Sequence, residues 1–303
     1  MKIEVICPLY NAEKYLKSLH EALLKQKNVE FMVKYILTES KDKTQEICKK
    51  LNVNYEKIRR EEFSHSLTRE KAIMESDADI VVLLTQDVKI LDELFLYMLT
   101  KDIILGKCEA TYARQISKSN SIEKYIRESN YPNKSIIKDK NSIKDLKLNT
   151  FFFSDAAAAI KRDVFVKLNG YDNKDLIISE DMYYAYKLIM NGYRIKYEAD
   201  AVVEHSHEFN NFEFFKRYFD TGVFFSENAY LDEYSSNKSG FKLLCYVIKR
   251  IIADKKYALL LQLFNNFICR YVGFKFGKNY NRLNKNVINK LTLNKMYWKS
   301  LKV

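Results

Sequence analysis

Five consecutive apolar residues, Ile80 to Leu84, limit the fold of this chain more than any other feature of its sequence. A strand with one face in water alternates apolar and polar residues, whereas this run shows no alternation, so both of its faces must be buried. Such strands lie at the centre of parallel sheets that helices cover on each side. The run therefore predicts an α/β protein with a mostly parallel central sheet.

Strand-like and helix-like segments alternate around this run, in the order expected for a doubly wound sheet. The predicted strands span 3–7, 35–37, 55–58, 80–84, 110–114, 156–160, 193–197 and 201–203, and the predicted helices span 13–26, 43–51, 67–75, 122–129 and 181–190. The polar stretch 130–150 is predicted to be a mobile loop. From Phe209 onward the pattern is helical almost to the end, so we expect a main domain over 1–208 and a helical region over 209–303.

The positive charge of the chain is confined to its last part. Residues 241–303 hold 14 Lys and Arg against one acidic residue, Asp254, a net charge of +13, whereas residues 1–240 hold 37 basic and 38 acidic residues. This tail interleaves its basic residues with apolar ones, which is typical of helices that lie on an anionic membrane surface. A helical subdomain with a solvated basic face is the alternative. Nucleic acid is not an expected partner, because no recognised binding motif accompanies the charge.

The cysteines and the N-terminal segment indicate a compartment. The five cysteines are widely spaced and lack a CxxC pair, which argues against a zinc knuckle or a disulfide scaffold and favours a reducing, cytoplasmic setting. The N-terminal apolar run contains Glu4 and is followed by Pro8, unlike a signal peptide. No stretch reaches the ~18 uninterrupted apolar residues of a membrane span. We expect a cytoplasmic protein, peripheral at the inner face of the cell membrane if the tail binds lipid.

A carboxylate, Asp87, closely follows the buried run, with Gln86 before it. Ligands of open α/β sheets bind at the carboxyl ends of the strands, which is where Asp87 is expected. Asp87 would hold Mg²⁺ or Mn²⁺ against a substrate diphosphate, since these cations prefer oxygen ligands and keep positions open for phosphate. Gln86 would offer a neutral oxygen. The alternative is that Asp87 only caps the next helix.

Glu180 and Asp181 stand at the start of a predicted helix, after the turn-rich stretch 170–179. Such a loop can deliver a carboxylate to the edge of the sheet, where Asp181 would act as general base. Acidic residues at a helix start are also favoured by free backbone amides and by the helix dipole. Both interpretations stay open.

Two histidines, His205 and His207, lie two residues apart and would share one face of an extended strand. One would ligate the same cation as Asp87 while the other orients a neighbour, although an incidental pair is the alternative. The segment with His65 and Arg69 ends a loop and begins a helix, where backbone amides and Arg69 would meet an anion. A simple helix cap is the alternative there.

Taken in chain order, these positions resemble the family 2 glycosyltransferases of the GT-A fold, and within them the bacterial rhamnosyltransferase-like group that builds surface polysaccharides. The resemblance rests on Cys7-Pro8-Leu9-Tyr10-Asn11, Ser40-Lys41-Asp42-Lys43-Thr44, Phe63-Ser64-His65 with Thr68-Arg69, Thr85-Gln86-Asp87, Ala113-Arg114-Gln115, Ser179-Glu180-Asp181, His205-Ser206-His207 and Arg217-Tyr218-Phe219-Asp220-Thr221-Gly222. It implies a GT-A catalytic domain over 1–208, with a nucleotide-sugar-binding half to about 115 and an acceptor half from about 116, followed by a basic helical extension.

The resemblance also implies a role for each matching residue. The nucleotide-sugar donor would contact Pro8, Leu9, Tyr10, Asn11, Glu39, Asp42, His65, Arg69, Gln86 and Asp87. Arg114, Gln115 and Glu180 would line the acceptor or donor-sugar pocket. Asp87 would hold Mg²⁺ or Mn²⁺ with His205 or His207, and Asp181 would deprotonate the acceptor hydroxyl.

Two positions depart from the family pattern. The acidic residue that usually stands shortly before Ser40 is replaced by Leu37-Thr38, and Glu39 would substitute from a shifted position. Gln86 replaces a second carboxylate of many relatives, a replacement that is frequent in the rhamnosyltransferase-like group.

We therefore expect an inverting, metal-dependent glycosyltransferase that moves rhamnose from dTDP-rhamnose to a lipid-linked or polysaccharide acceptor. Another donor, such as a UDP-hexose or UDP-N-acetylhexosamine, and a noncatalytic scaffold of the same fold that docks on membrane are the alternatives. A nucleotidyltransferase is disfavoured, because residues 9–12 contain no glycine for a phosphate-binding loop.

Overall fold

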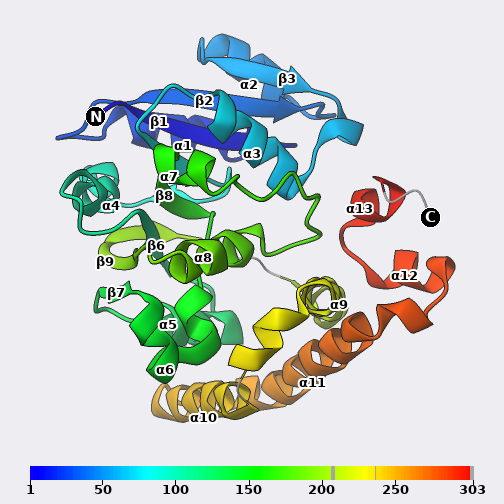
Figure 1. The fold of residues 1–303 in the computed structure, drawn as a ribbon. Coiled ribbons are helices and arrows are strands. Elements are labelled where there is room, and N and C mark those ends of the chain that lie inside the picture. The colour runs from blue at the N-terminus through cyan, green and yellow to red at the C-terminus, as the bar shows by residue number, and fades with distance from the viewer. Residues whose placement is uncertain (206–208, 236, 301–303) are drawn as a thin grey trace. The chain divides into compact units, whose positions relative to one another are not determined.

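The computed structural model describes residues 1–205, 209–235 and 237–300, drawn as a ribbon in Figure 1. The strands are β1 Ile3–Leu9, β2 Met32–Thr38, β3 Tyr55–Ile58, β4 Ile80–Leu84, β5 Lys89–Ile90, β6 Ala110–Ile116, β7 Ile136–Lys138, β8 Ala157–Lys161 and β9 Ile195–Glu204. The α-helices are α1 Leu16–Leu24, α2 Thr44–Lys50, α3 His65–Glu75, α4 Phe95–Ile104, α5 Ile122–Asn130, α6 Ile143–Leu146, α7 Arg162–Lys167, α8 Glu180–Met190, α9 Asn211–Glu227, α10 Asn237–Ala253, α11 Ala258–Lys278, α12 Lys285–Leu291 and α13 Lys295–Ser300. Short 3₁₀ helices are η1 Arg60–Glu62, η2 Lys140–Ser142, η3 Lys147–Phe151, η4 Ala229–Tyr234 and η5 Tyr280–Arg282.

The first four strands form the parallel part of the sheet, in the order β3-β2-β1-β4. All five residues of β4 are buried, and the strand has the bounds that its uninterrupted apolar run predicted. Along the chain, the strand order reverses at β1, because β2 pairs with one of its sides and β4 with the other. The carboxyl ends of β1 and β4 therefore lie at the switch point where open α/β sheets bind ligands.

Beyond β4 the sheet becomes mixed, in the order β4-β8-β6-β9-β5, with β7 paired to β9. Strand β8 runs antiparallel to both β4 and β6, whereas β6 and β9 are parallel. The α/β fold class is confirmed, with parallel pairing in β1–β4 and between β6 and β9. The two strands expected at 193–197 and 201–203 are one strand, β9, whose register against β6 shifts between Ala113 and Arg114.

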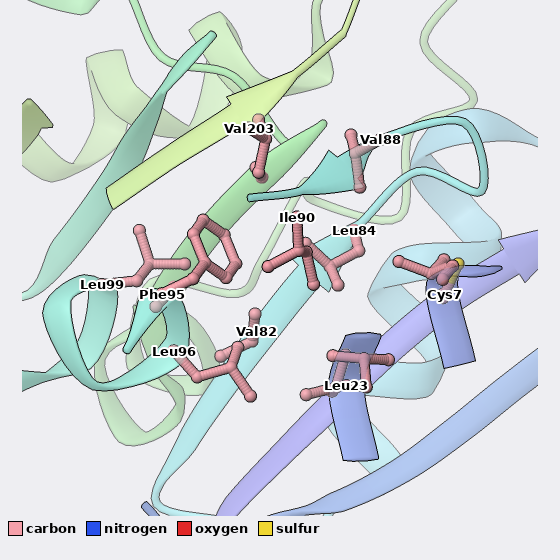
Figure 2. Close-up of a cluster of buried hydrophobic side chains, with 14 of the residues drawn as sticks. Cys7, Leu23, Val82, Leu84, Val88, Ile90, Phe95, Leu96, Leu99 and Val203 are labelled. Atoms are coloured by element: carbon pink, nitrogen blue, oxygen red, sulfur yellow. The ribbon is translucent and has the colours of Figure 1, made fainter. Parts of the chain in front are cut away.

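One hydrophobic core packs against one face of this sheet. Helix α1 buries Leu16, Leu19 and Leu23 against residues of β1 and β4, because these leucines share one helical face. Figure 2 shows part of the cluster, in which side chains of α4 lie among Val82 and Val203 of the strands. Each such buried side chain contributes about 1.5–3 kcal/mol to folding.

The stretch 130–150, predicted to be a mobile loop, instead contains β7, α6 and two 3₁₀ helices. One contact that orders this stretch is made by a buried lysine on β7, Lys138, which is 2% exposed. Its Nζ donates to the Tyr112 hydroxyl at 3.2 Å, to the Asn149 carbonyl at 3.3 Å and to the Phe152 carbonyl. The polar composition misled the prediction, because this polar group is used for hydrogen bonds inside the protein.

By their contacts the residues form two compact units. The first unit comprises 1–116, 131–174 and 181–205 and contains the whole sheet. The second comprises 117–130, 175–180 and the described residues from 209 onward. The second unit thus takes two segments from the region 1–208, which the sequence analysis assigned to one catalytic domain.

Within the second unit, α9 and α11 touch along their backbones. A Cβ atom added to Gly222 would lie 2.3 Å from the Phe274 carbonyl oxygen, and one added to Gly277 would lie 2.0 Å from the Phe219 carbonyl oxygen. Gly273 makes a similar approach. No side chain fits at these distances, so glycine is required where the two helices meet.

Candidate active site

The ends of β1 and β4 are joined by Gln86. Its Oε1 accepts a hydrogen bond from the Tyr10 amide at 2.7 Å, and its Nε2 donates to the Tyr10 carbonyl at 2.9 Å. Both ends of the Gln86 amide are thus engaged with the backbone. Gln86, the residue before Asp87, therefore holds Tyr10 and with it the end of β1, at Pro8 and Leu9, and its oxygen is already used for this contact.

A second set of hydrogen bonds joins the loop after β1 to the loop after β2. The Asn11 amide donates to Ser40 Oγ at 3.0 Å, and the Lys41 amide donates to Asn11 Oδ1 at 3.1 Å. Asn11 has a positive φ of 48°, a left-handed conformation that Asn tolerates better than most residues. The two loops are therefore built as one surface at the carboxyl edge of the sheet.

Asp42 belongs to the same surface. Its carboxylate accepts hydrogen bonds from the Glu13 amide at 3.0 Å and from the Thr44 hydroxyl at 2.5 Å. Desolvation opposes ionisation, but these hydrogen bonds prevail and hold the pKa of Asp42 below its ordinary value. Glu39 directly follows β2 and is exposed, so its carboxylate faces solvent at the same edge.

The sequence analysis missed Arg60, which the structure places on this surface. Its guanidinium lies over the Tyr10 ring, 5.3 Å from the ring centroid, and the residue is exposed. A cation stacked on an aromatic ring suits contact with a nucleotide base or phosphate. The adjacent pair Arg59-Arg60 was the only sequence signal, because the stacking depends on the turn after β3.

His65 and Arg69 lie on the first turns of α3, as predicted. Ser64 caps the helix and His65, its first residue, is exposed. Arg69 is 5% exposed, and its Nη1 donates to the His65 carbonyl at 2.9 Å. Burial raises the pKa of the Cys7 thiol well above its ordinary value, and the charges of Arg69 and Asp87 modify it in opposite directions. The charges of Arg69 and Asp87 are therefore both felt at Cys7, near the carboxyl end of β1.

Asp87 and His205, remote in sequence, meet in the first unit. Nε2 of His205 lies 3.4 Å from Oδ2 of Asp87. Nδ1 of His205 lies 2.9 Å from Oε1 of Gln115, whose Nε2 donates to Ser154 Oγ at 2.8 Å. Because the amide nitrogen of Gln115 faces Ser154, its oxygen faces His205 and accepts the Nδ1 proton. Nε2 is thus the ring nitrogen that faces Asp87 and is placed to bind a cation.

Asp87 and His205 together offer one carboxylate and one imidazole nitrogen to a divalent cation. Among the described side chains, no group of three or more His, Cys, Asp and Glu residues forms a metal site. Asp87 and His205 would thus supply two ligands, leaving the other positions to phosphate oxygens and water, as Mg²⁺ sites usually do. A histidine oriented through its second nitrogen is the usual arrangement of a metal ligand. His207 lies outside the described residues.

The remaining predicted residues lie on β6 and at the start of α8. Arg114 is on β6 beside Tyr197, whose pKa is raised by burial and moderated by the Arg114 charge. Gln115, predicted for a sugar pocket, is instead 1% exposed and contacts His205. Glu180 and Asp181 open α8, where Glu180 is buried and Asp181 is partly exposed. Asp181 belongs to the same unit as Asp87 and His205.

A buried carboxylate that the sequence analysis did not mark, Glu70, supports the loop that precedes α8. Its Oε1 accepts hydrogen bonds from the Tyr171 amide at 2.6 Å and the Asn173 amide at 3.3 Å. Burial raises the pKa of Glu70. On the same helix, Ser66 Oγ donates to the Lys174 carbonyl at 2.7 Å. Two side chains of helix α3 thus hold the backbone of residues 171–174 by hydrogen bonds.

Comparison with known proteins assigns the chain to a family. Residues 4–168 match the family model described as Glycosyl transferase family 2. The chain is 32% identical to the O-antigen chain rhamnosyltransferase RfbN of Salmonella typhimurium, over 99% of this chain and 97% of that protein. It is also 32% identical to the O-antigen chain rhamnosyltransferase WbaN of Salmonella anatum, over 98% of this chain and 96% of that protein.

Solved structures share the fold at lower identity. The mannosyltransferase PcManGT from Pyrobaculum calidifontis, solved in complex with GDP-Man and Mn²⁺, superposes with a TM-score of 0.61 at 13% identity, over 93% of this chain and 88% of that chain. Residues 1–349 of S. aureus TarS give a TM-score of 0.53 at 17% identity, over 92% of both chains. The predicted GT-A type fold is confirmed by these similarities.

Proposed function

The chain belongs to glycosyl transferase family 2 and is a glycosyltransferase, and we propose that it transfers rhamnose from dTDP-rhamnose to a glycan or lipid-linked acceptor with inversion at the anomeric carbon. The choice of rhamnose rests on the two relatives, both of which are O-antigen chain rhamnosyltransferases that match over nearly the whole chain. The acceptor would be a growing surface polysaccharide.

One observation carries the proposal: the Asp87–His205 pair, oriented by Gln115, lies beyond the carboxyl end of β4. This is the position at which a sheet of this topology holds a nucleotide. Tyr10, with Arg60 over its ring, is tied to the neighbouring Gln86. The nucleotide would lie on the joined loops, with its diphosphate toward Asp87.

Asp87 and His205 would hold Mg²⁺ or Mn²⁺, which when bound would neutralise charge on the leaving diphosphate. Asp181 would accept the proton of the acceptor hydroxyl as general base. The acceptor oxygen then forms a bond to the anomeric carbon while the bond from that carbon to the diphosphate oxygen breaks. The electron pair leaves with dTDP, and the configuration at carbon inverts.

The test uses the purified full chain with Mn²⁺ or Mg²⁺ and measures release of nucleotide from dTDP-rhamnose, UDP-GlcNAc, UDP-glucose and GDP-Man. We expect turnover with dTDP-rhamnose, lost in EDTA, and a decrease of about 10²–10⁴-fold in Asp181→Asn with donor binding retained. Asp163→Asn is the matched control, because Asp163 also lies in the first turn of a helix.

Each result has a defined meaning. Undiminished turnover in Asp181→Asn would remove Asp181 as the base. Turnover with another sugar nucleotide would replace dTDP-rhamnose as the donor. Absence of both turnover and sugar-nucleotide binding would favour the noncatalytic scaffold.

The tail offers a surface for an anionic membrane, which would bring the enzyme to a lipid-linked acceptor. Helix α11 carries apolar side chains at helical spacing on its outer face: Tyr257 just before it, Leu261, Phe264, Ile268 and Tyr271, which are 58%, 80%, 69%, 48% and 65% exposed. We call these five residues the α11 stripe. No helix within the described ranges is long and apolar enough to cross a bilayer. A stripe of this kind fits insertion at the membrane interface.

Basic residues accompany the stripe. Exposed Lys275 continues it at the C-terminal end of α11, and Lys242, Lys249 and Lys255 are exposed on or next to α10. Figure 1 shows α10 and α11 following one another along the second unit. Attraction of about 1 kcal/mol per basic residue near an anionic leaflet would add to the burial of the stripe.

A further inference from the structure

The last described segment of the chain is anchored on helix α9 by a buried carboxylate, Asp220. Its Oδ1 accepts a hydrogen bond from Thr292 Oγ1 at 2.6 Å, and its Oδ2 accepts from the amides of Leu293 at 2.9 Å and Asn294 at 3.2 Å. Asp220 is 2% exposed and Thr292 is fully buried. Three donors directed at one buried carboxylate form a specific attachment, since such a group is costly to bury without them.

A second acidic residue of α9 anchors the same segment. Oε1 of Glu227 accepts hydrogen bonds from the Tyr297 hydroxyl at 2.8 Å and from the Tyr280 hydroxyl at 3.3 Å. Tyr297 belongs to α13, which Asn294 caps through its Oδ1, 3.2 Å from the Tyr297 amide. Residues 292–300 are therefore held on α9 at two points. We call them the C-terminal latch.

The latch contacts the loop 175–180, which belongs to the same unit. Nδ2 of Asn294 donates to the Ile177 carbonyl at 3.0 Å, and Ser300 Oγ donates to Asp175 Oδ2 at 2.9 Å. Ile177 is 2% exposed, so its carbonyl depends on partners inside the protein. One side chain of the latch thus caps α13 and holds this loop.

The loop ends where α8 begins, at Glu180, directly before Asp181. Ser179 has a positive φ of 64°, a conformation that costs a non-glycine residue about 1 kcal/mol or more. Such backbone strain persists only when surrounding contacts hold it. The direction in which the chain enters α8 therefore depends on the contacts of the loop.

We infer that Asp220 and Asn294 are positioning residues for the transfer reaction: through the latch they hold loop 175–180 in the conformation that places Asp181. The inference rests on the proposed role of Asp181 as general base. A displacement of about 1 Å in a catalytic group can lower a rate by up to 10²-fold. Loss of the latch is therefore expected to lower kcat and to leave donor binding unchanged.

The test is Asn294→Ser. Serine keeps the capping function at the start of α13 but is too short to reach the Ile177 carbonyl. The matched control is Asn284→Ser, which makes the same change at the cap of α12, where Asn284 accepts from the Val287 amide. Asp220→Asn is the second variant, because it removes the charge to which three donors point.

With the full chain, we expect Asn294→Ser to lower kcat about 10-fold or more with KM for dTDP-rhamnose unchanged within 2-fold. Asn284→Ser should leave both unchanged. A kcat like that of the parent protein in Asn294→Ser, or an equal loss in the control, would overturn the inference. So would a parallel loss of donor affinity, which indicates general destabilisation.

Hydrogen exchange separates failure of this inference from failure of the proposed function. Amides in a peptide covering 175–182 should exchange at least 10-fold faster in Asn294→Ser and Asp220→Asn than in Asn284→Ser, whether or not the protein turns over dTDP-rhamnose. Unchanged exchange in that peptide would show that the latch does not hold the loop. Faster exchange in a protein whose turnover does not depend on Asp181 would show that the latch holds the loop but does not position a catalytic base.

Discussion

Gln115 and His205 form one contact that sets the chemistry of the candidate metal site: Oε1 of Gln115 lies 2.9 Å from Nδ1 of His205. In this orientation of its amide, Gln115 also donates from Nε2 to Ser154 Oγ at 2.8 Å. With Oε1 of Gln115 accepting from Nδ1, Nε2 is the nitrogen that faces Asp87 and that would bind a cation held by the pair. Proteins use such second contacts to raise the affinity of a histidine for metal.

Replacing this contact should weaken metal binding. Gln115→Leu preserves the volume of a buried side chain but removes the acceptor, so His205 loses its fixed tautomer. We expect Mn²⁺ affinity to fall about 10- to 100-fold, measured by calorimetry without a sugar nucleotide. Ser154→Ala should cause a smaller loss, since it frees the amide without removing it. Equal affinities in Gln115→Leu and the parent protein would contradict the assigned orientation.

Gly170 should tolerate no side chain. An added Cβ atom would lie 2.5 Å from Oε1 of Glu70 and 2.7 Å from Cε1 of Phe165, and its φ is +45°. Gly170→Ala should therefore lower the free energy of unfolding by at least about 2 kcal/mol, combining overpacking with backbone strain. Gly106→Ala is the control, because Gly106 also has a positive φ but nothing within 4 Å of an added Cβ. Similar urea midpoints for the two variants would argue against close packing around Gly170.

Lys138 should make stability depend on pH. Burial lowers its pKa to about 7 in the folded protein, whereas an unfolded lysine titrates near 10.4. Between these values the unfolded chain binds more protons, so the contribution of Lys138 to the free energy of unfolding increases as pH rises. The change amounts to a few kcal/mol over the window, at 1.36 kcal/mol per pKa unit.

Lys138→Met removes the titrating group and provides the comparison. The difference in the free energy of unfolding between the parent protein and Lys138→Met should shift in favour of the parent protein from pH 7 to 9.5, as measured by urea denaturation. A constant difference across this range would mean that Lys138 keeps its proton in the folded state.

The α11 stripe should bind anionic vesicles. Leu261→Glu with Phe264→Glu replaces its two most exposed side chains and adds negative charge, so partition to vesicles that contain phosphatidylglycerol should fall at least about 10-fold. Leu105→Glu is the control, because Leu105 is 63% exposed in the first unit. Sedimentation with liposomes measures the effect. Equal binding to neutral and anionic vesicles, or no difference between the variants, would exclude electrostatic docking by this face.

Apolar pattern predicted most of the first unit, because strands buried on both faces and amphipathic helices leave a local signature. The strands at 55–58 and 80–84 have the predicted bounds, and the other predicted strands differ by a few residues, whereas β5 and β7 were not predicted. Helices α4 and α7 were not predicted. Helix α4 buries residues on several sides, including Thr100 and Asp102, so a stripe was not evident.

The candidate site was predicted by residue type more than by contact. Asp87 and His205 were expected to meet, and they do, but the contacts of Gln86 with Tyr10 and of Gln115 with His205 were not foreseen. An amide side chain gives no sequence signal for its partner, because the choice depends on which strands are neighbours. The antiparallel insertion of β8 between β4 and β6, which sets those neighbours, has no local signature either.

The glycine contacts between α9 and α11 have a mechanical consequence. With carbonyl oxygens of one helix against the Cα atoms of the other, there is no intervening layer of side chains whose rotamers could absorb a displacement. The two helices are therefore expected to move together as one rigid body. Whatever tilts the outward face of α11 also tilts Asp220.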